Sequence, residues 1–364
     1  MTHKLVAENL RDRPLRTFLS ILLIGVPVTL ILSLVGLSQG MLDESARRAR
    51  GIGADVLVRP PGSSALSLTG APLPEELAAR LEEEPHVAQA MGALNFSISG
   101  FTYIAGVNIQ DFNRMSGGFI FLEGGPFQSP NDIIIDDYYA RQHQLHAGGT
   151  ISLLNRNWRV AGVVEPGKLS HLILLLDVLQ ELTGSRGRVT QIFLKLDDPA
   201  NAPRVIASLR RLLPGYPIYS MEEFTSLFTV SNVPGLQTFI DVLSAIGVVI
   251  GFIVIWLSMH MAVSHRTREI GILKSLGASQ WYIAGVVVAE ALVLGVAGVI
   301  VGIALSFGAR WLIHTLVPAS LTMAIAVEWW PIVALITLGG VLLGALYPGI
   351  AAARQDAVAA LSYE

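Results

Sequence analysis

The sequence predicts an α-helical membrane protein with four transmembrane helices, one near the N-terminus and three near the C-terminus. A large α+β extracytoplasmic domain is expected between the first and second helices. Two observations support this fold class. The 364 residues have a mean hydropathy of +0.56 and only 15% charged residues, whereas soluble domains have about 25%. Apolar runs at both ends each exceed about 18 residues, which is the length that crosses a hydrocarbon core as a helix.

The first span is expected at residues 17–38, which contain no charge. This run is longer than the apolar region of a signal peptide, so an uncleaved helix with a kink at Pro27 is predicted. Residues 1–16 before it contain four cations and apolar residues at near-helical spacing. They are predicted to form an interfacial helix on the inner leaflet. The alternative is a charged tail that only sets the topology.

Residues 41–235 have mixed composition and alternate between strand-like and helix-like patterns, which is typical of an α+β domain. Strands are expected at 55–59, 133–135 and 191–196, a hairpin within 151–164 turning near 155–157, and helices at 74–84 and 203–213. The glycine-rich stretch 116–125 lacks the Lys and Ser/Thr of a phosphate loop. It is predicted to be a loop with one buried apolar patch.

Residues 239–364 are predicted to form a compact helical domain with spans at 239–263, 283–309 and 331–352. Each span contains two glycines four residues apart, which share one helix face and allow another backbone to approach closely. These transmembrane packing pairs are Gly247 and Gly251, Gly298 and Gly302, and Gly340 and Gly344. Three pairs in three spans predict a tightly packed bundle.

The polar segment 264–282 joins two of these spans on one side of the membrane. Arg266, Arg268 and Lys274 outnumber its one acid, Glu269, and short loops rich in Lys and Arg stay cytoplasmic. An apolar stripe at helical spacing, Ile270, Leu273 and Leu276, predicts a short amphipathic helix. Gly277 is the expected helix stop, and Ser279, after Ala278, is the expected cap of the following helix.

Glu290 is the one acid well inside an apolar span. A buried ionisable group in a membrane is costly, so a functional role is one interpretation. The other is an acid near the cytoplasmic end of the span that reaches the interface.

The residues exclude several classes of function. The chain has no cysteine, so disulfides, thiolate metal sites and cysteine catalysis are absent. The net charge of −3 gives no basis for binding nucleic acid. His143 and His146 could contact a metal, but no third ligand is evident, and no metal site or catalytic residue is predicted. The sequence contains no Walker A motif, so no ATPase activity or cofactor is expected in this chain.

Residues 266–279, Arg-Thr-Arg-Glu-Ile-Gly-Ile-Leu-Lys-Ser-Leu-Gly-Ala-Ser, resemble the cytoplasmic segment of the MacB/FtsX-type ABC transporter permeases. Residues 347–354 with 356–364 are similar to the C-terminal motif of that family, and residues 7–17 to its start. The resemblance implies that residues 266 and 268–279 couple the permease to an ATPase. It also implies that Glu290 pairs with the cytoplasmic end of a neighbouring helix.

The resemblance further implies a multi-pass protein of the bacterial inner membrane with both termini cytoplasmic. Its expected partners are a separate ABC ATPase, which binds ATP and Mg, and a second permease copy or paralogue. A periplasmic adaptor, lipoprotein or hydrolase is a further expected partner, as are membrane lipids. The implied function is ATP-driven movement of the outer domain for export or extraction of a lipid, lipoprotein, peptide or drug. The alternative is a non-transporting FtsX-like scaffold that regulates a cell-wall hydrolase.

The charge distribution makes a prediction about topology. The segment 264–282 contains three basic residues, Arg266, Arg268 and Lys274, whereas Arg310 is the one Lys or Arg of the last outer loop. The segment should therefore be cytoplasmic. Because the chain has no cysteine, a Ser275→Cys variant can be probed with a membrane-impermeant thiol reagent. We expect labelling only after permeabilisation, while a single cysteine within 41–235 reacts in intact cells. Labelling of position 275 in intact cells would contradict this topology.

Overall fold

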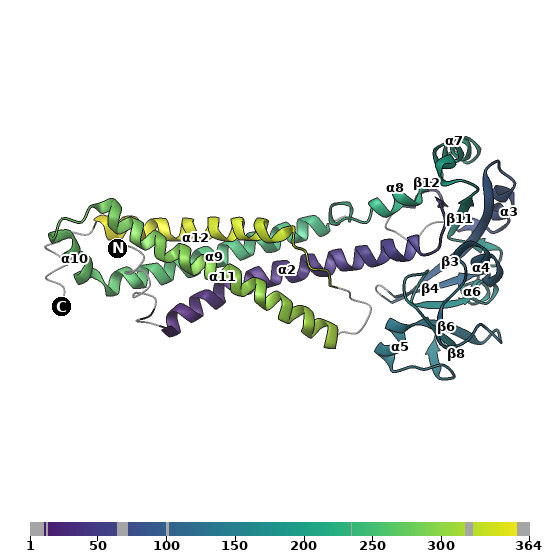
Figure 1. Ribbon diagram of the computed structural model, residues 1–364, viewed down its shortest axis with the longest axis horizontal. Coiled ribbons are helices and arrows are strands. Elements are labelled where there is room, and N and C mark those ends of the chain that lie inside the picture. Colours follow the sequence, from purple (N-terminus) through teal and green to yellow (C-terminus); the bar gives the residue numbers. More distant parts are fainter. Residues whose placement is uncertain are drawn as a thin grey trace. The chain divides into compact units, whose positions relative to one another are not determined.

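A computed structural model describes residues 11, 14–63, 72–99, 102–233, 235–316 and 323–354. The chain divides into two units, which are described separately (Figure 1). The helical unit contains residues 1–38, 235–313 and 323–364, and the α+β domain contains residues 39–234 and 314–322.

Among the described residues, four helices are long and apolar enough to cross a membrane. They are α2 (Pro14–Arg50), α9 (Leu236–His265), α11 (Gln280–Leu316) and α12 (Trp329–Arg354), and the short helix α10 (Thr267–Ser275) joins α9 to α11. This confirms the predicted fold class. Helix α2 continues beyond the expected end at residue 38, so its last turns belong to the α+β domain. Residues 1–10 of the expected interfacial helix and 356–364 of the C-terminal motif lie outside the described residues.

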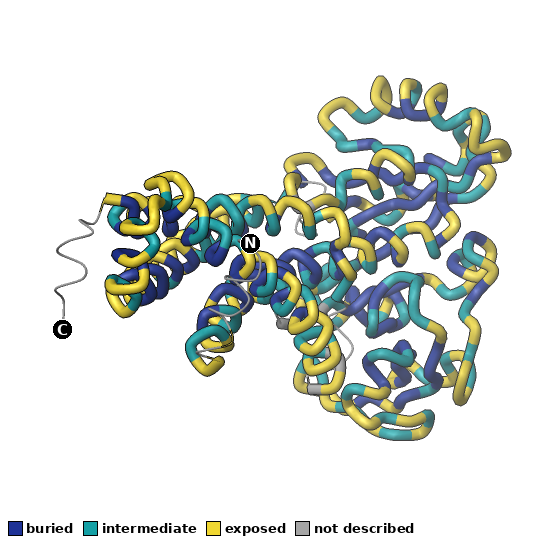
Figure 2. Tube along the Cα trace, turned by 60° about the vertical axis from the view of Figure 1, so that its left-hand side comes forward, coloured by how far each residue is buried: buried dark blue, intermediate teal, exposed yellow. Residues whose placement is uncertain are grey.

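Many large apolar side chains on these four helices are exposed. Figure 2 marks in yellow the exposed positions along the backbone. The buried core of the unit is a cluster that includes Ile24, Ile255, Ala291 and Ala345. A helix with apolar residues on all sides is typical of contact with lipid on one face and with neighbouring helices on the other.

Helices α2 and α11 approach closely because glycines lie between them. A Cβ atom added at Gly298 would lie 2.6 Å from the side chain of Ile24, and one at Gly302 would lie 2.6 Å from that of Val28. Thr29 donates its hydroxyl hydrogen bond to the carbonyl of Gly25 or of Gly302, at 2.9 and 3.0 Å. The pair on α11 therefore faces another helix, as the spacing predicted.

The remaining glycine pairs give a mixed result. Gly344 of α12 lies against α9, where a Cβ atom would come within 2.7 Å of the Phe252 carbonyl oxygen, and Gly340 lies against Val248. Gly247 of α9 lies against Pro27. Among the described residues, a Cβ atom at Gly251 would meet nothing within 4 Å, so the predicted close helix contact is wrong there, although the residue is buried.

The α+β domain is built on a mixed sheet. Among the described residues, ten strands form one sheet in the order β12-β1-β11-β3-β4-β9-β6-β8-β5, with β7 paired to β8, and β2 pairs with β10 separately. The strands are β1 (Val56–Val58), β2 (Leu73–Pro74), β3 (Val87–Ser99), β4 (Thr102–Val107), β5 (Phe121–Gly124), β6 (Asp132–Asp136), β7 (Thr150–Leu153), β8 (Arg156–Val164), β9 (Leu172–Leu175), β10 (Arg188–Val189), β11 (Gln191–Leu196) and β12 (Ile218–Ser220).

Helices cover both faces of this sheet and form two apolar clusters. They are α3 (Glu76–Glu82), α4 (Ile109–Ser116), α5 (Asp137–His143), α6 (Leu176–Thr183), α7 (Ala202–Leu212) and α8 (Met221–Ser226). Successive residues of one strand point to opposite faces. Accordingly Ile133 and Ile135 of β6 belong to the apolar cluster on one face of the sheet, and Ile134 belongs to the cluster on the other face. A strand buried on both faces reads as a continuous apolar run, which is why 133–135 was recognisable from sequence.

Two local predictions differ from the structure. The hairpin between β7 and β8 turns at Leu154 and Asn155, both with positive φ, one residue earlier than expected. The stretch 116–125 is not all loop, because residues 121–124 form the edge strand β5. Phe119 and Phe121 supply the expected apolar patch. Pairing of β5 with β8 overrides the low strand propensity of its glycine-rich surroundings.

The contact between α2 and α11 makes a testable prediction. Leucine at Gly298 or Gly302 should separate the two backbones and destabilise the helical unit by roughly 1 kcal/mol or more. Gly308→Leu is the matched control, because a Cβ atom at this α11 position meets nothing within 4 Å. Thermal unfolding of the purified variants measures the effect. If Gly298→Leu and Gly302→Leu unfold at the same temperature as Gly308→Leu, the glycine contact does not stabilise the unit.

Candidate functional site

The candidate site is helix α10 and the turn that follows it. Gly277 has φ +92°, a left-handed conformation that favours glycine. The Ala278 amide donates to the Leu273 carbonyl at 3.0 Å, and the Gly277 amide donates to the Lys274 carbonyl at 3.0 Å. These two bonds form a Schellman motif, which satisfies the last carbonyls of the helix. The predicted helix stop at Gly277 is confirmed.

The next helix begins as the sequence predicted. The Ser279 hydroxyl oxygen accepts a hydrogen bond from the Tyr282 amide at 3.2 Å, just where α11 starts at Gln280. This is the geometry of a helix N-cap, and it satisfies one of the unpaired amides of the first turn. Because both ends of the turn are capped, residues 276–279 form a defined corner between α10 and α11.

The predicted apolar stripe does not form one surface. Ile270 is buried at 8% exposure and belongs to the apolar cluster of the helical unit, Leu273 is half-buried, and Leu276 is 79% exposed. A step of three residues falls about 60° short of a full helical turn, so two steps separate the first and last side chains by about 120°. Ile270 therefore packs within this chain, on a different side of the helix from Leu276.

The exposed face of α10 has a different composition from the one predicted. Ile272, which the sequence reasoning missed, is 45% exposed and lies one helical turn before Leu276. The spacing of four between them could have identified this face. The exposed positions of the helix are Arg268, Glu269, Ile272, Ser275 and Leu276. Trp281, at the start of α11, is 87% exposed and was also missed.

The opposite side of α10 is joined to α11 by charge. Arg266, at the junction of α9 and α10, approaches Glu290 of α11 with 3.5 Å between Nη1 and Oε2. Glu290 is buried, so its carboxylate does not extend into solvent at the interface. A buried carboxylate is costly unless a cation or donor compensates it. The structure therefore brings together two residues that the sequence analysis singled out separately.

A second polar contact joins α10 to α12. The Lys274 ammonium donates a hydrogen bond to the Ala353 carbonyl at 2.7 Å, in the last turn of α12. The last carbonyls of a helix lack intrahelical partners, and a lysine satisfies them favourably. Lys274 thus faces the helical unit, and Ala278 also packs against the apolar cluster. Neither residue belongs to the exposed face of α10.

A third polar contact, which the sequence reasoning missed, lies between α2 and α9. The Ser258 hydroxyl lies 3.1 Å from that of Ser20 and accepts a hydrogen bond from Arg16 at 3.2 Å. Isolated serines are common in membrane helices, so no sequence signal marks this pair.

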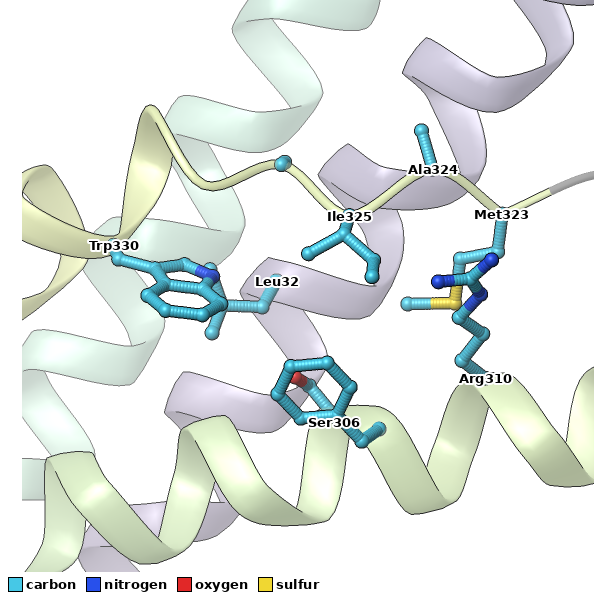
Figure 3. Close-up of a pocket in the computed structure, with 9 residues that line it drawn as sticks. Leu32, Ser306, Arg310, Met323, Ala324, Ile325 and Trp330 are labelled. Carbon is cyan, nitrogen blue, oxygen red and sulfur yellow. The ribbon is translucent and has the colours of Figure 1, made fainter.

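A small pocket lies where α11 ends and α12 begins, between Leu32, Ser306 and Trp330 (Figure 3). Its volume of about 20 Å³ is enough for one water molecule. In the described parts of the chain, no three His, Cys, Asp or Glu side chains gather as a metal site would require. His146 instead pairs with Glu123 at 3.1 Å.

Comparison with known proteins identifies both parts of the chain. Residues 17–212 match the MacB-like periplasmic core domain, and residues 242–357 match the FtsX-like permease C-terminal domain. The chain is 25% identical over 326 residues to the macrolide export ATP-binding/permease protein MacB of Aggregatibacter actinomycetemcomitans, covering 80% of this chain and 50% of that protein.

Two uncharacterized ABC transporter permeases are also similar. One, from Methanocaldococcus jannaschii, is 30% identical over 173 residues, covering 44% of this chain and 43% of that protein. The other, from Mycobacterium tuberculosis, is 22% identical over 311 residues and is covered to 83% of its length. The chain spans about half the length of several curated relatives that it matches. The two family matches cover most of the chain, which therefore belongs to the FtsX-like permeases that contain a MacB-like periplasmic core domain.

Proposed function

We propose that this chain is the permease subunit of an ABC transporter, driven by an ATPase on a separate polypeptide that binds ATP and Mg. The observation that supports this most directly is the exposed face of α10. Leu276 and Ile272 are exposed in a polar segment between two membrane helices, and the opposite face of the same helix is fastened to α11 and α12. A helix with one fixed face and one free apolar face is suited to docking in the groove of a partner.

The proposed docking contact combines an apolar pair of side chains with two charged side chains beside it. Burial of one leucine or isoleucine side chain contributes roughly 1.5–3 kcal/mol. Arg268 and Glu269, one turn earlier on the exposed face, flank the apolar pair and can form ion pairs at the rim. The proposed docking residues are therefore Arg268, Glu269, Ile272 and Leu276. Arg266, Ile270 and Lys274 hold the helix in position.

We propose that ATP hydrolysis by the ATPase drives a movement of the extracytoplasmic domain. Helix α2 links the two units, since it begins in the helical unit and its last turns belong to the α+β domain. A second permease copy or a paralogue completes the transmembrane part. The proposed cargo class is a lipid, lipoprotein, peptide or drug, in line with the macrolide export named for the MacB relatives.

The exposed face of α10 makes the first prediction of this proposal. Leu276→Asp should leave the protein inserted in the membrane but weaken its binding to the ATPase by about tenfold or more, since a charge cannot enter an apolar groove. Leu212→Asp is the matched control, because Leu212 is an exposed leucine at the end of α7. Co-purification with the ATPase and permease-dependent ATP hydrolysis are measured. Equal values for both variants would contradict docking through this face.

The contact between Arg266 and Glu290 makes a second prediction. Arg266→Gln leaves a buried carboxylate without this cation and should destabilise the helical unit by up to about 3 kcal/mol. The double variant Arg266→Gln with Glu290→Gln removes both charges and should recover most of that stability. Thermal unfolding and permease-dependent ATP hydrolysis are measured on the two single variants, Arg266→Gln and Glu290→Gln, and on the double variant. Additive effects of the two single substitutions would show that the pair does not interact.

A further inference from the structure

A buried charge network lies in the α+β domain, far along the sequence from α10. Its centre is Arg48, in the last turn of α2, whose side chain is 9% exposed. The Arg48 guanidinium lies 2.8 Å from the Asp136 carboxylate at the end of β6 and 3.0 Å from the Glu44 carboxylate on α2. His171, next to β9, lies 2.8 Å from Asp136 and 3.0 Å from Arg48. The network therefore links α2 to two neighbouring strands of the sheet.

The charges in this network depend on one another. Burial by itself raises the pKa of the Asp136 carboxyl, but the hydrogen bonds and charges of His171 and Arg48 outweigh it and hold the pKa below its ordinary value. Asp136 also accepts a hydrogen bond from the Tyr139 amide at 2.9 Å and so caps α5. Among the described residues, Nη1 of Arg48 is buried with no hydrogen-bond partner. The arrangement is thus not optimised for stability, because such an unsatisfied donor is costly.

The end of α2 is also packed too closely for side chains. A Cβ atom at Gly51 would lie 1.9 Å from the Gly167 carbonyl oxygen, and one at Gly53 would lie 3.1 Å from that of Met115. Lys168 donates hydrogen bonds to the carbonyls of Ser116 and Gly118. These contacts hold the chain just after α2 against the end of α4.

Buried ion pairs contribute little net stability, since apolar residues of similar volume do as well or better. What a buried network can supply is a unique geometry, because a shifted arrangement leaves charges unpaired. A shift of a helix packed on a sheet through apolar contacts alone disturbs the packing but leaves no charge unpaired. Arg48 contacts partners on α2, at β6 and beside β9 at once, and those contacts exist together in one register only.

We propose that Arg48 is a positioning residue that fixes the register of α2 on the sheet, so that a displacement of α2 is passed to the domain without slippage. This inference rests on the proposed function, in which the ATPase drives a movement of the extracytoplasmic domain. It assigns the positioning of α2 to residues of the α+β domain, whereas the proposed ATPase-docking face belongs to the helical unit.

The test compares two adjacent arginines in the full-length protein. Arg47 also pairs with Glu44 but is 56% exposed, so Arg47→Met is the matched control for Arg48→Met. Spin labels are placed on the cysteine-free chain by Ser45→Cys on α2 and Arg141→Cys on α5, both exposed positions of the domain. We expect one narrow distance distribution in the parent and in Arg47→Met. In Arg48→Met the single narrow peak should be lost.

A second variant distinguishes an effect on the register of α2 from an effect on the stability of the protein. Arg48→Met with Asp136→Asn removes the charges of these two residues, Glu44 keeps its ion pair with Arg47, and the side-chain oxygen at position 136 still caps α5. It should unfold at the temperature of the parent yet show the broadened distances, which a purely stabilising role for Arg48 would not produce. Narrow distances in this double variant would overturn the proposal, whether or not Arg48→Met alone folds. The measurement needs no ATPase, so it is independent of whether Leu276→Asp disrupts docking.

Discussion

The helical unit depends on one constraint: its helices must hold together where water, and with it most of the hydrophobic driving force, is absent. Under that constraint, close packing and satisfied polar groups are what remain. The structure shows both. Gly298 and Gly302 let α11 contact α2 at backbone distance, and Gly344 does the same between α12 and α9. Polar contacts such as Arg266 with Glu290 and Ser20 with Ser258 lie between helices rather than towards lipid.

The position of α10 follows from the same packing. Its buried face contributes Ile270 to the apolar cluster, and its two polar contacts reach α11 and α12. Each contact compensates a polar group on a membrane helix, namely a buried carboxylate on α11 and a terminal carbonyl of α12. The helix is therefore part of the bundle and not an appendage of a loop. The exposed face of α10 therefore belongs to a helix that is joined to α9, α11 and α12.

Much of this architecture could be predicted from local patterns. Long apolar runs identify the spans, because hydrocarbon requires them, and Gly277 and Ser279 mark a helix end and a helix start through backbone chemistry that acts over a few residues. The spacing of four places Ile272 and Leu276 on one face of α10, but it does not show whether that face is exposed. Ile270 and Ile272 are equally apolar, and only the neighbouring helices decide which of them is buried. Strand β5 was missed because its pairing partner lies about forty residues away, where no local pattern records it. The link from Arg48 to Asp136 likewise joins residues that no spacing rule relates.

Helix α2 has 37 residues, which at 1.5 Å per residue makes it about 55 Å long. Its last twelve residues, 39–50, lie beyond the predicted span at 17–38, so roughly 18 Å of the helix extends past that span. A tilt of about 10°, within the range seen for membrane helices, moves the end of this extension by about 3 Å. That distance is about the rise of two helical residues, so even a small change in the tilt of the span displaces the end of α2 by a distance comparable to a step along the helix.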